Sequence, residues 1–255
     1  MRGMTWTTKS GRVDVASGSI RWLTLTEESS GPSGLEASPD FLHPEEIAHR
    51  DTLKVDKRRR DWTLGRRAAK ELLAELIREK TGFQIALSAI VVIPHPDGWP
   101  VVTLPENAGV GEITLSISHT RDVAFCAATE GANRLLGADI EFVETRAAAF
   151  AEAYYTDLER RFLAAAAADQ QTILLNAIWS GKEAALKAIR RGLAEDTRIV
   201  ACLPHPIMNN EAEWLPMRIE WTDERAAQSM PPLRGYWRHE GDFVLTLAFA
   251  ATAVT

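Results

Sequence analysis

Cysteine is scarce in this chain of 255 residues, which contains only Cys126 and Cys202. Neither residue lies in a CxxC pair or at the spacing of a metal site, and two cysteines do not build a disulfide framework. The N-terminal stretch MRGMTWTTKSGRVDV lacks the apolar core of a signal peptide. We therefore expect a protein of the reducing cytoplasm.

Long apolar runs and an excess of positive charge are also missing. The C-terminal run FVLTLAFAATAV is too short to span a membrane and predicts a buried strand. The net charge of −6 argues against general nucleic-acid binding. Basic residues are nevertheless concentrated at 49–70, HRDTLKVDKRRRDWTLGRRAAK. This pattern favours one specific anionic ligand.

Strand and helix patterns alternate without a regular βαβ rhythm, which predicts an α+β fold. Alternating runs predict strands at 19–26, 113–120, 122–130 and 135–144. Helical periodicity predicts a helix at 61–82 that ends at Gly82. It also covers most of 147–192, where Thr156 and Glu159 form a capping box and Gly192 is the expected end of the helix. Residues 64–73 can be laid over 180–189, which indicates two related halves.

Two carboxylates share one face of the strand LLGADIEFV. Side chains alternate along a strand, so Asp139 and Glu141 point the same way. They repel each other unless a positive group joins them, and Mg²⁺ is one such group. A solvated strand face is the alternative.

The segment WSGKEAALKAI places charged residues among apolar ones. Glu183 and Lys187 are four residues apart and share one helix face. One interpretation is an ordinary ion pair on the surface. The other follows because the helix looks substantially buried and its charged residues need partners: Glu183 would be a third metal-binding carboxylate, and Lys187 would reach a phosphate. His119 is either a structural residue or a donor to a phosphate oxygen. The basic cluster is either a solvated helix face or a phosphate site; it consists of Arg58, Arg59, Arg60 and Arg66.

Taken together, these segments resemble the 4′-phosphopantetheinyl transferase superfamily, and most closely its larger, two-half Sfp-type class, which activates surfactin synthetase. The family's elements occur in order between about Arg58 and Gly192. They are RRRDWTLGRRAAKELL, DGWPVV, LSISHT, LGADIE, YYTDLE and WSGKEAALKA. Two positions depart from the family pattern: Trp99 replaces a basic residue, and Ala138 replaces Val or Ile.

The resemblance implies transfer of the phosphopantetheine arm of coenzyme A to a serine of an apo acyl or peptidyl carrier protein, with adenosine 3′,5′-bisphosphate as the other product. It implies two α+β halves related by a pseudo-two-fold axis, residues 1–132 and 133–255, in a monomer without nucleic-acid or membrane partners. Mg²⁺, or Mn²⁺, would be bound by Asp139, Glu141 and Glu183. The expected catalytic residues are Glu183, Lys187 and His119. Expected coenzyme A contacts are Arg59, Arg60, Arg66, Gly98, Pro100, Ser118, His119, Lys182 and Lys187.

Two other classes of function stay open. A Mg²⁺-dependent nuclease or phosphodiesterase also combines acidic residues with a lysine, although its Glu and Lys usually stand two apart on a strand. A non-catalytic carrier-protein-binding module of the same fold is the second alternative. The retained acids and Lys187 count against it.

Overall fold

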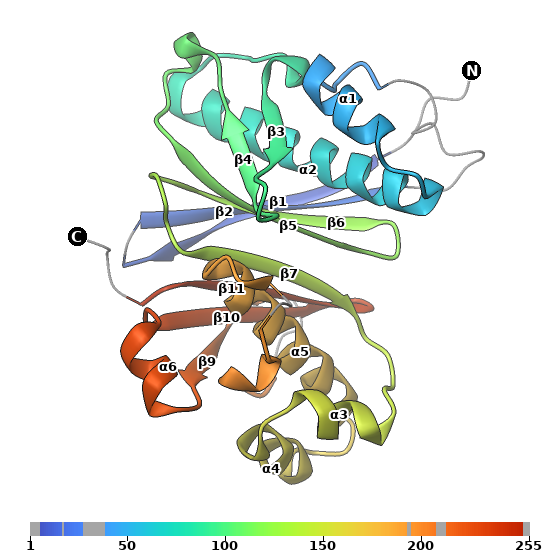
Figure 1. Cartoon of the computed structure of the whole chain (residues 1–255), viewed down its shortest axis with the longest axis vertical. Coiled ribbons are helices and arrows are strands. Elements are labelled where there is room, and N and C mark those ends of the chain that lie inside the picture. The colour runs from blue at the N-terminus through green and yellow to red at the C-terminus, as the bar shows by residue number, and fades with distance from the viewer. Residues whose placement is uncertain (1–5, 17, 28–38, 193–194, 208–212, 252–255) are drawn as a thin grey trace. The chain divides into compact units, whose positions relative to one another are not determined.

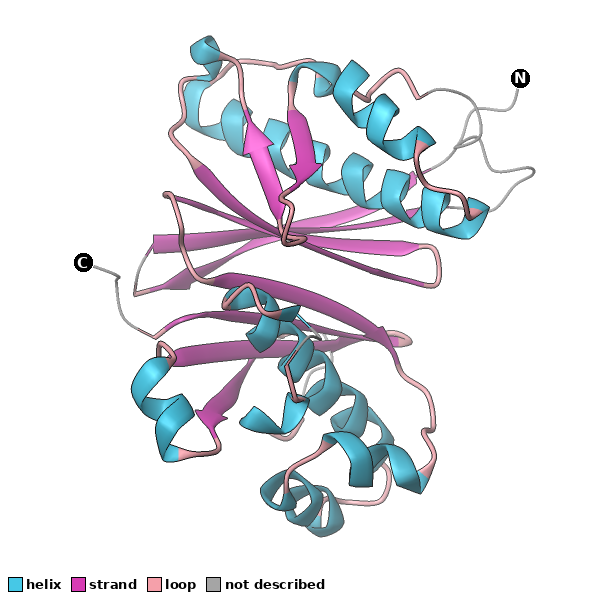
Figure 2. Cartoon of the chain, viewed as in Figure 1, coloured by secondary structure: helices cyan, strands magenta, loops and turns pink. Residues whose placement is uncertain are grey.

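The computed structural model describes residues 6–16, 18–27, 39–192, 195–207 and 213–251. The chain divides into two compact units, Met1–Asn133 and Arg134–Thr255, called here the first and the second unit. The sequence places the border after residue 132, one residue earlier. Within each unit an antiparallel sheet packs against helices (Figure 2). The α+β fold class is therefore confirmed.

The first unit contains a four-stranded sheet in the order β1-β2-β6-β5 and a separate β3-β4 hairpin. Helix α2 lies against β6, β2 and β5 (Figure 1). Three-residue helical turns occur at Leu87–Ala89 and Glu106–Ala108. In chain order the main elements are β1 (Trp6–Val15), β2 (Gly18–Glu27), α1 (Pro44–Asp51), α2 (Asp56–Thr81), β3 (Val91–Pro94), β4 (Pro100–Thr103), β5 (Ile113–Thr120) and β6 (Val123–Glu130).

Local sequence signals explain why α2 forms and where it ends. Leu64, Ala68 and Leu72 recur at helical spacing and are all buried in the core of the unit. Gly82 takes φ +74°, the left-handed conformation that closes a helix, and its N–H donates to the Arg78 carbonyl. The predicted stop at Gly82 is confirmed. The predicted start at residue 61 comes five residues too late.

The second unit contains a five-stranded sheet in the order β7-β11-β10-β9-β8. Helix α5 lies against β7, β11 and β8. A helical turn at Thr197–Ile199 precedes β8. In chain order the main elements are β7 (Leu136–Phe142), α3 (Ala148–Tyr154), α4 (Asp157–Ala165), α5 (Gln171–Ala188), β8 (Val200–Pro204), β9 (Leu215–Trp221), α6 (Glu224–Ser229), β10 (Leu233–Glu240) and β11 (Phe243–Ala250).

Gly137 allows β7 to approach α5 closely. A Cβ at this position would lie 1.8 Å from the Ala184 carbonyl oxygen, so no other residue fits without moving the helix. The capping box of Thr156 and Glu159 forms as predicted. The stop at Gly192 is wrong, because α5 already ends at Ala188 and Arg190 takes the left-handed conformation at φ +59°.

Strand β1 was not among the predicted elements. Six of its residues are exposed, and Val13 is buried. It pairs along its whole length with β2 and lies at the edge of the sheet. Its sequence therefore lacks the alternation of apolar and polar residues by which a strand is predicted. The Gly- and Ser-rich segment 28–38 lies outside the described residues. No helix in the described part of the chain is long and apolar enough to cross a membrane.

Candidate active site

The two acidic residues of β7 point toward α5. They lie on the same strand face as Gly137, which touches the backbone of α5. Asp139 is 2% exposed, although the sequence also allowed a solvated strand face. Glu183 extends from α5, and its side chain is 15% exposed. Three carboxylates from one strand and one helix therefore belong to the same site.

Lys187 connects this group. Its ammonium donates to Asp139 Oδ1 at 2.6 Å and to the Ala138 carbonyl at 3.4 Å, and it lies 4.0 Å from Glu183 Oε2. The Glu183–Lys187 pair is thus not an isolated pair on a solvated helix face, because the lysine's shortest contact is to another element. The predicted grouping of Asp139, Glu183 and Lys187 is present in the structure.

Two of the carboxyls, Glu141 and Glu183, have a raised pKa. Burial first, and then the charge of Asp139, raises the pKa of Glu183 to about 7. Burial and Asp139 likewise raise the pKa of Glu141 to about 7, although Arg146 opposes this. Burial opposes the charged form of Lys187, but Asp139 and Glu183 outweigh it and raise the lysine's pKa. The site accumulates negative charge that protons or cations must balance.

Arg146, which sequence reasoning missed, supplies a second positive charge. It lies between β7 and α3, and its Nη2 donates to Glu141 Oε2 at 2.9 Å. Trp179 Nε1 donates to the other carboxylate oxygen, Glu141 Oε1, at 3.0 Å. The only sequence signal was an isolated arginine before the apolar run AAAF. Its partner could not be read from spacing.

Lys182 requires a correction. The resemblance implies a coenzyme A contact, yet the side chain is fully buried on the other side of α5. Its ammonium lies 2.8 Å from Glu159 and donates to the carbonyls of Thr197 and Val200. All of these partners are inside the second unit. Lys182 therefore acts in this structure as half of a buried ion pair, which does not fit a role in binding coenzyme A.

Three arginines expected to bind the 3′-phosphate lie on α2 in different environments. Arg60 is exposed. Arg59 donates to Asp56 Oδ1 at 3.2 Å and to the Leu53 carbonyl at 2.9 Å. Arg66 is 7% exposed, and its Nε donates to the Val92 carbonyl at 2.6 Å. Burial lowers the pKa of Arg66 to about 10, against the opposing charge of Glu46.

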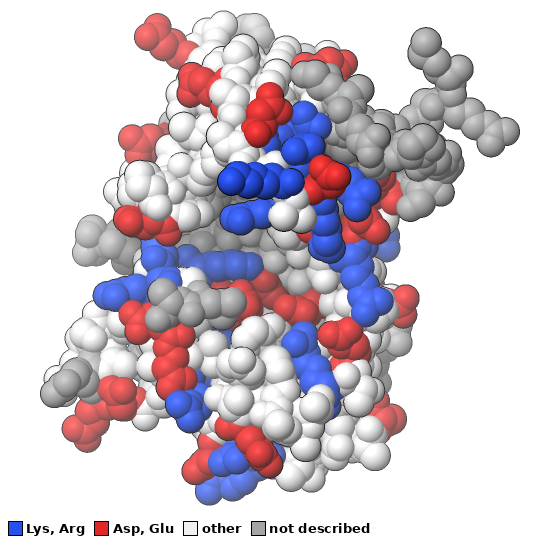
Figure 3. All heavy atoms as spheres, turned by 45° about the vertical axis from the view of Figure 1, so that its right-hand side comes forward, with Lys and Arg blue, Asp and Glu red and all other residues white. Residues whose placement is uncertain are grey.

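His49 joins these cations and was also missed. Burial first, and then the charges of Arg66 and Arg58, lowers the pKa of the imidazole. The His49 and Trp62 rings are 5.3 Å apart, and the Arg66 guanidinium lies 4.4 Å over the Trp62 ring. Figure 3 shows basic side chains gathered on one face of the first unit. This cluster is suited to an anion, and its role as a phosphate site stays a prediction.

The remaining predicted residues of the first unit lie on two hairpins. His119 is exposed and Ser118 is buried on β5. Gly98 takes φ +105° in the β3–β4 turn just before Pro100. The Trp99 ring stacks on His95 at 3.8 Å, so the residue that departs from the family pattern has a partner within its own hairpin. The binding roles of these residues stay predictions.

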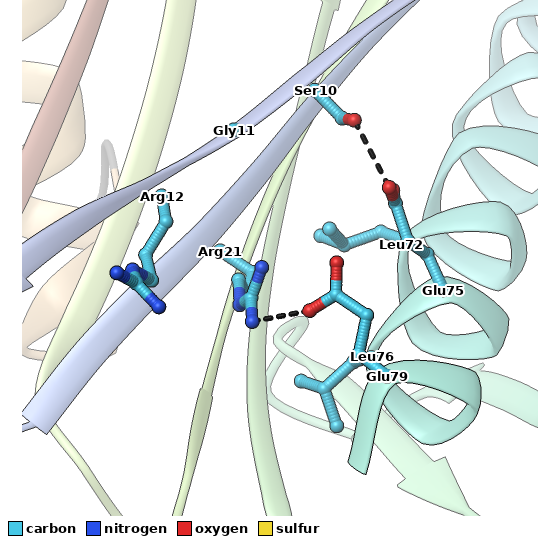
Figure 4. Close-up of a pocket in the computed structure, with 8 residues that line it drawn as sticks. All are labelled: Ser10, Gly11, Arg12, Arg21, Leu72, Glu75, Leu76 and Glu79. Carbon is cyan, nitrogen blue, oxygen red and sulfur yellow. Dashed lines mark hydrogen bonds and ion pairs between the residues drawn. The ribbon is translucent and has the colours of Figure 1, made fainter. Parts of the chain in front are cut away.

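A cavity of about 220 Å³ in the first unit contains none of the predicted site residues (Figure 4). It lies between β1, β2 and α2. Ser10 donates to Glu75, Arg21 pairs with Glu79, and Arg12 pairs with Asp14, which lies outside the lining. The charged side chains of the lining thus have partners within the first unit.

The carboxylates fit a hard divalent cation in the kind of donor they offer, because Mg²⁺ prefers oxygen ligands. Burial, and then the charge of Asp139, raises the pKa of Glu141 and Glu183, and a bound cation would oppose both effects. Among the described residues, however, no three acidic, His or Cys side chains are already gathered around one metal position. In the structure Lys187 and Arg146 supply the balancing charges. A metal bound by Asp139 and Glu183 would have to compete with Lys187 for their oxygens.

Residues 135–248 match a family model described as ACPS, the 4′-phosphopantetheinyl transferase superfamily. The match covers β7, α5 and most of β11, and so contains the whole carboxylate–lysine group. The resemblance inferred from the sequence is confirmed at the level of this superfamily. The assignment to the Sfp-type class stays a prediction.

Solved structures give weaker likenesses. Helicobacter pylori holo-[acyl-carrier-protein] synthase in complex with coenzyme A is 23% identical, covers 36% of this chain and 77% of its own, and has a TM-score of 0.30. The Plasmodium yoelii holo-ACP-synthase is 23% identical over 34% of this chain and 70% of its own, with a TM-score of 0.29. The ACPS–CoA complex of Chronobacterium ammoniagenes is 21% identical over 50% and 99%, with a TM-score of 0.33.

Scores this low carry no argument about function. None of the curated proteins compared with the chain matches it.

Proposed function

We propose that this protein transfers the 4′-phosphopantetheine arm of coenzyme A to a serine of an apo acyl or peptidyl carrier protein, as an enzyme of the holo-[acyl-carrier-protein] synthase type and the Sfp-type class. One observation carries the proposal: the segment that matches the superfamily contains Asp139, Glu183 and Lys187 in one group. The ordered motifs of the first unit support it.

In this reaction the serine hydroxyl oxygen attacks the phosphorus that bears pantetheine. A new phosphodiester bond forms, and the bond to the oxygen of adenosine 3′,5′-bisphosphate breaks. Glu183 is assigned as the base that accepts the serine proton. Lys187 offsets the charge that grows on the departing bisphosphate.

Asp139, Glu141 and Glu183 would hold a Mg²⁺ ion, which would neutralise the pyrophosphate when bound. Asp139 is the most buried of the three carboxylates. His119 is assigned to a pyrophosphate oxygen, and Arg59, Arg60 and Arg66 to the 3′-phosphate. For Arg66 this role requires it to give up part of its contact with the Val92 carbonyl.

The test is incubation of the protein with coenzyme A and a panel of apo carrier proteins, with Mg²⁺ or with excess chelator. We expect one carrier to gain the mass of a phosphopantetheine group only when metal is present. The same carrier with its acceptor serine changed to alanine is the control. Cleavage of nucleic acid without carrier modification would favour a nuclease, and carrier binding without a mass gain would favour a non-catalytic module.

A further inference from the structure

Arg146 is held more firmly than a surface arginine. Its Nε donates to Asn176 Oδ1 at 3.0 Å while its Nη2 donates to Glu141. The guanidinium lies 4.5 Å over the Phe150 ring and 5.8 Å over the Trp179 ring. A planar cation held by two hydrogen bonds and two rings has little rotational freedom.

Asn176 is itself fixed, so it orients Arg146. The residue is fully buried on α5. Its amide nitrogen donates to the carbonyls of Glu144 and Thr172, each at 2.8 Å. Because both amide hydrogens are committed, only one orientation of the amide leaves Oδ1 facing the arginine. The contacts form a chain from the interior of α5 through Asn176 and Arg146 to Glu141.

Each oxygen of the Glu141 carboxylate therefore has a donor from a different element. Arg146 comes from the segment after β7, and Trp179 comes from α5. Such donors determine which way a carboxylate faces, and they leave lone pairs on both oxygens for another partner. An anchor that only secured the 143–147 segment would not need its charged end on this particular carboxylate.

We propose that Arg146 is a positioning residue: with Asn176 behind it and Trp179 opposite, it fixes the Glu141 carboxylate in the orientation in which it helps bind a divalent cation. The inference rests on the proposed function only in taking Glu141 as part of a cation site. It assigns the arginine a role through Glu141, without a contact to substrate.

Two variants separate orientation from charge. Arg146→Gln removes a positive charge, which by electrostatics alone would tighten cation binding. Arg146→Lys keeps the charge but loses the two-pronged geometry. Loss of orientation predicts weaker binding in both, by about 10-fold, the scale of changes behind a metal ligand. Arg160→Gln is the matched control, because Arg160 is an exposed arginine of the same unit that pairs with Asp157.

The measurement is the Kd for Mn²⁺, from electron paramagnetic resonance titration of the purified protein at about pH 8, where the carboxyls are ionised. We expect weaker binding in both Arg146 variants, an unchanged Kd in Arg160→Gln, and little further loss when Arg146→Gln is added to Glu141→Gln. Trp179→Phe removes only the opposite donor and should also weaken binding. It tests the idea even where an Arg146 variant fails to fold.

Unchanged or tighter Mn²⁺ binding in Arg146→Gln and Arg146→Lys would overturn the proposal, and a lower melting temperature alone would show a merely structural role. A wild-type protein that binds no Mn²⁺ would overturn it too. The proposed function is judged separately, by the carrier mass gain of the wild type. A protein that shows the Mn²⁺ effects but modifies no carrier would keep this inference and lose that function.

Discussion

The two units repeat one order of elements but use the same strand face differently. In the first unit the order is β2, α1, α2, β3, β4, β5 and β6, and in the second it is β7, α4, α5, β8, β9, β10 and β11, with α3 added before α4 and α6 added before β10. In both, the last two strands form a hairpin whose final strand pairs with the first strand of the series. Residues 64–73 and 180–189 lie on α2 and α5, which hold the same place in these two series; the sheets differ, because β3 and β4 form a separate sheet whereas β8 and β9 belong to the main one.

A buried carboxylate occupies the same place in both units. Glu46 and Glu159 are the third residues of α1 and α4, and each closes a capping box. Each also accepts a backbone N–H from the next strand, Val92 in one unit and Cys202 in the other. Each is paired with a buried lysine of the long helix, Lys70 or Lys182. The overlay of 64–73 on 180–189 matches Lys182 with Arg66, so Lys70 stands one helical turn further along its helix. This frame is structural in both units.

The face between the first strand and the long helix differs. Counting from the hairpin turns, Leu23 and Leu25 of β2 occupy the positions of Asp139 and Glu141 of β7. On the helix, Arg67 and Glu71 stand where Glu183 and Lys187 stand in the second unit. The leucines are buried in the core, and the Arg67–Glu71 pair is left at its edge.

A shared frame thus supports a core in one unit and a candidate active site in the other. At this face the two units differ in the side chains at the matching positions. Function must accordingly be argued from the site itself. The following predictions test this contrast.

The largest expected effect is loss of stability from the shared frame. Glu159→Gln should leave Lys182 buried without its opposite charge and lower the free energy of unfolding by about 3–5 kcal/mol. Glu46→Gln should do the same through Lys70. Urea unfolding measures both, and hydrogen exchange shows which unit opens. If both variants lost less than about 1 kcal/mol of unfolding free energy, the buried ion pair would contribute little to the stability of either unit.

The next effect separates the two helix pairs. Glu183→Gln should reduce phosphopantetheine transfer by about 10²-fold or more, because it removes the proposed base and a charge of the cation site. Glu71→Gln removes the glutamate of the Arg67–Glu71 pair at the corresponding place on α2, and as the matched control it should leave transfer unchanged. Asp139→Ala should abolish transfer while the fold is retained. Steady-state kinetics beside melting temperatures check all three, and near-wild-type kcat in Glu183→Gln would remove the assigned role.

Stability should also depend on pH through the second unit. A carboxyl whose pKa is raised to about 7 on folding binds its proton more tightly in the folded state than in the unfolded state, where the pKa is near 4.5. The contribution of Glu141 and Glu183 therefore becomes destabilising as pH rises from 4.5 to about 7. In chelator at about pH 8, Glu183→Gln should raise the free energy of unfolding by about 1 kcal/mol.

At about pH 4 the Glu183 carboxyl of the folded protein is protonated and, like glutamine, uncharged. Glu183→Gln should therefore change the free energy of unfolding little at this pH. Glu71→Gln is again the control and should show no such pH-dependent gain. Chemical denaturation at both pH values decides the matter. Equal effects of Glu183→Gln at the two pH values would contradict the raised pKa.

The smallest effect concerns the basic face of the first unit. Arg60→Ala should raise KM for coenzyme A about 5-fold and leave KM for 3′-dephospho-coenzyme A unchanged, because the proposed contact is to the 3′-phosphate alone. Lys80→Ala, at the far end of α2, is the control. Equal effects on both substrates would assign Arg60 to another task, such as contact with the carrier protein.

The sequence by itself determined the features that local rules control. Helical spacing and Gly82 predicted the end of α2, and alternation placed Asp139 and Glu141 on one strand face. The capping-box pattern of Thr156 and Glu159 predicted a helix start at this point, and α4 begins there. These signals suffice because each depends on backbone geometry within a few residues.

Only the tertiary structure decided which charges meet. Lys182 and Lys187 are five residues apart on one helix, yet one is buried against Glu159 and the other reaches Asp139. Arg146 acquires its role from Glu141 and Asn176, which lie on β7 and α5. Spacing in the sequence assigns a side chain to one face of its own helix or strand. The partner that meets it there comes from a distant segment, so the sequence does not name it. Burial then shifts the pKa of the charged group and determines how much free energy is lost when that group has no partner.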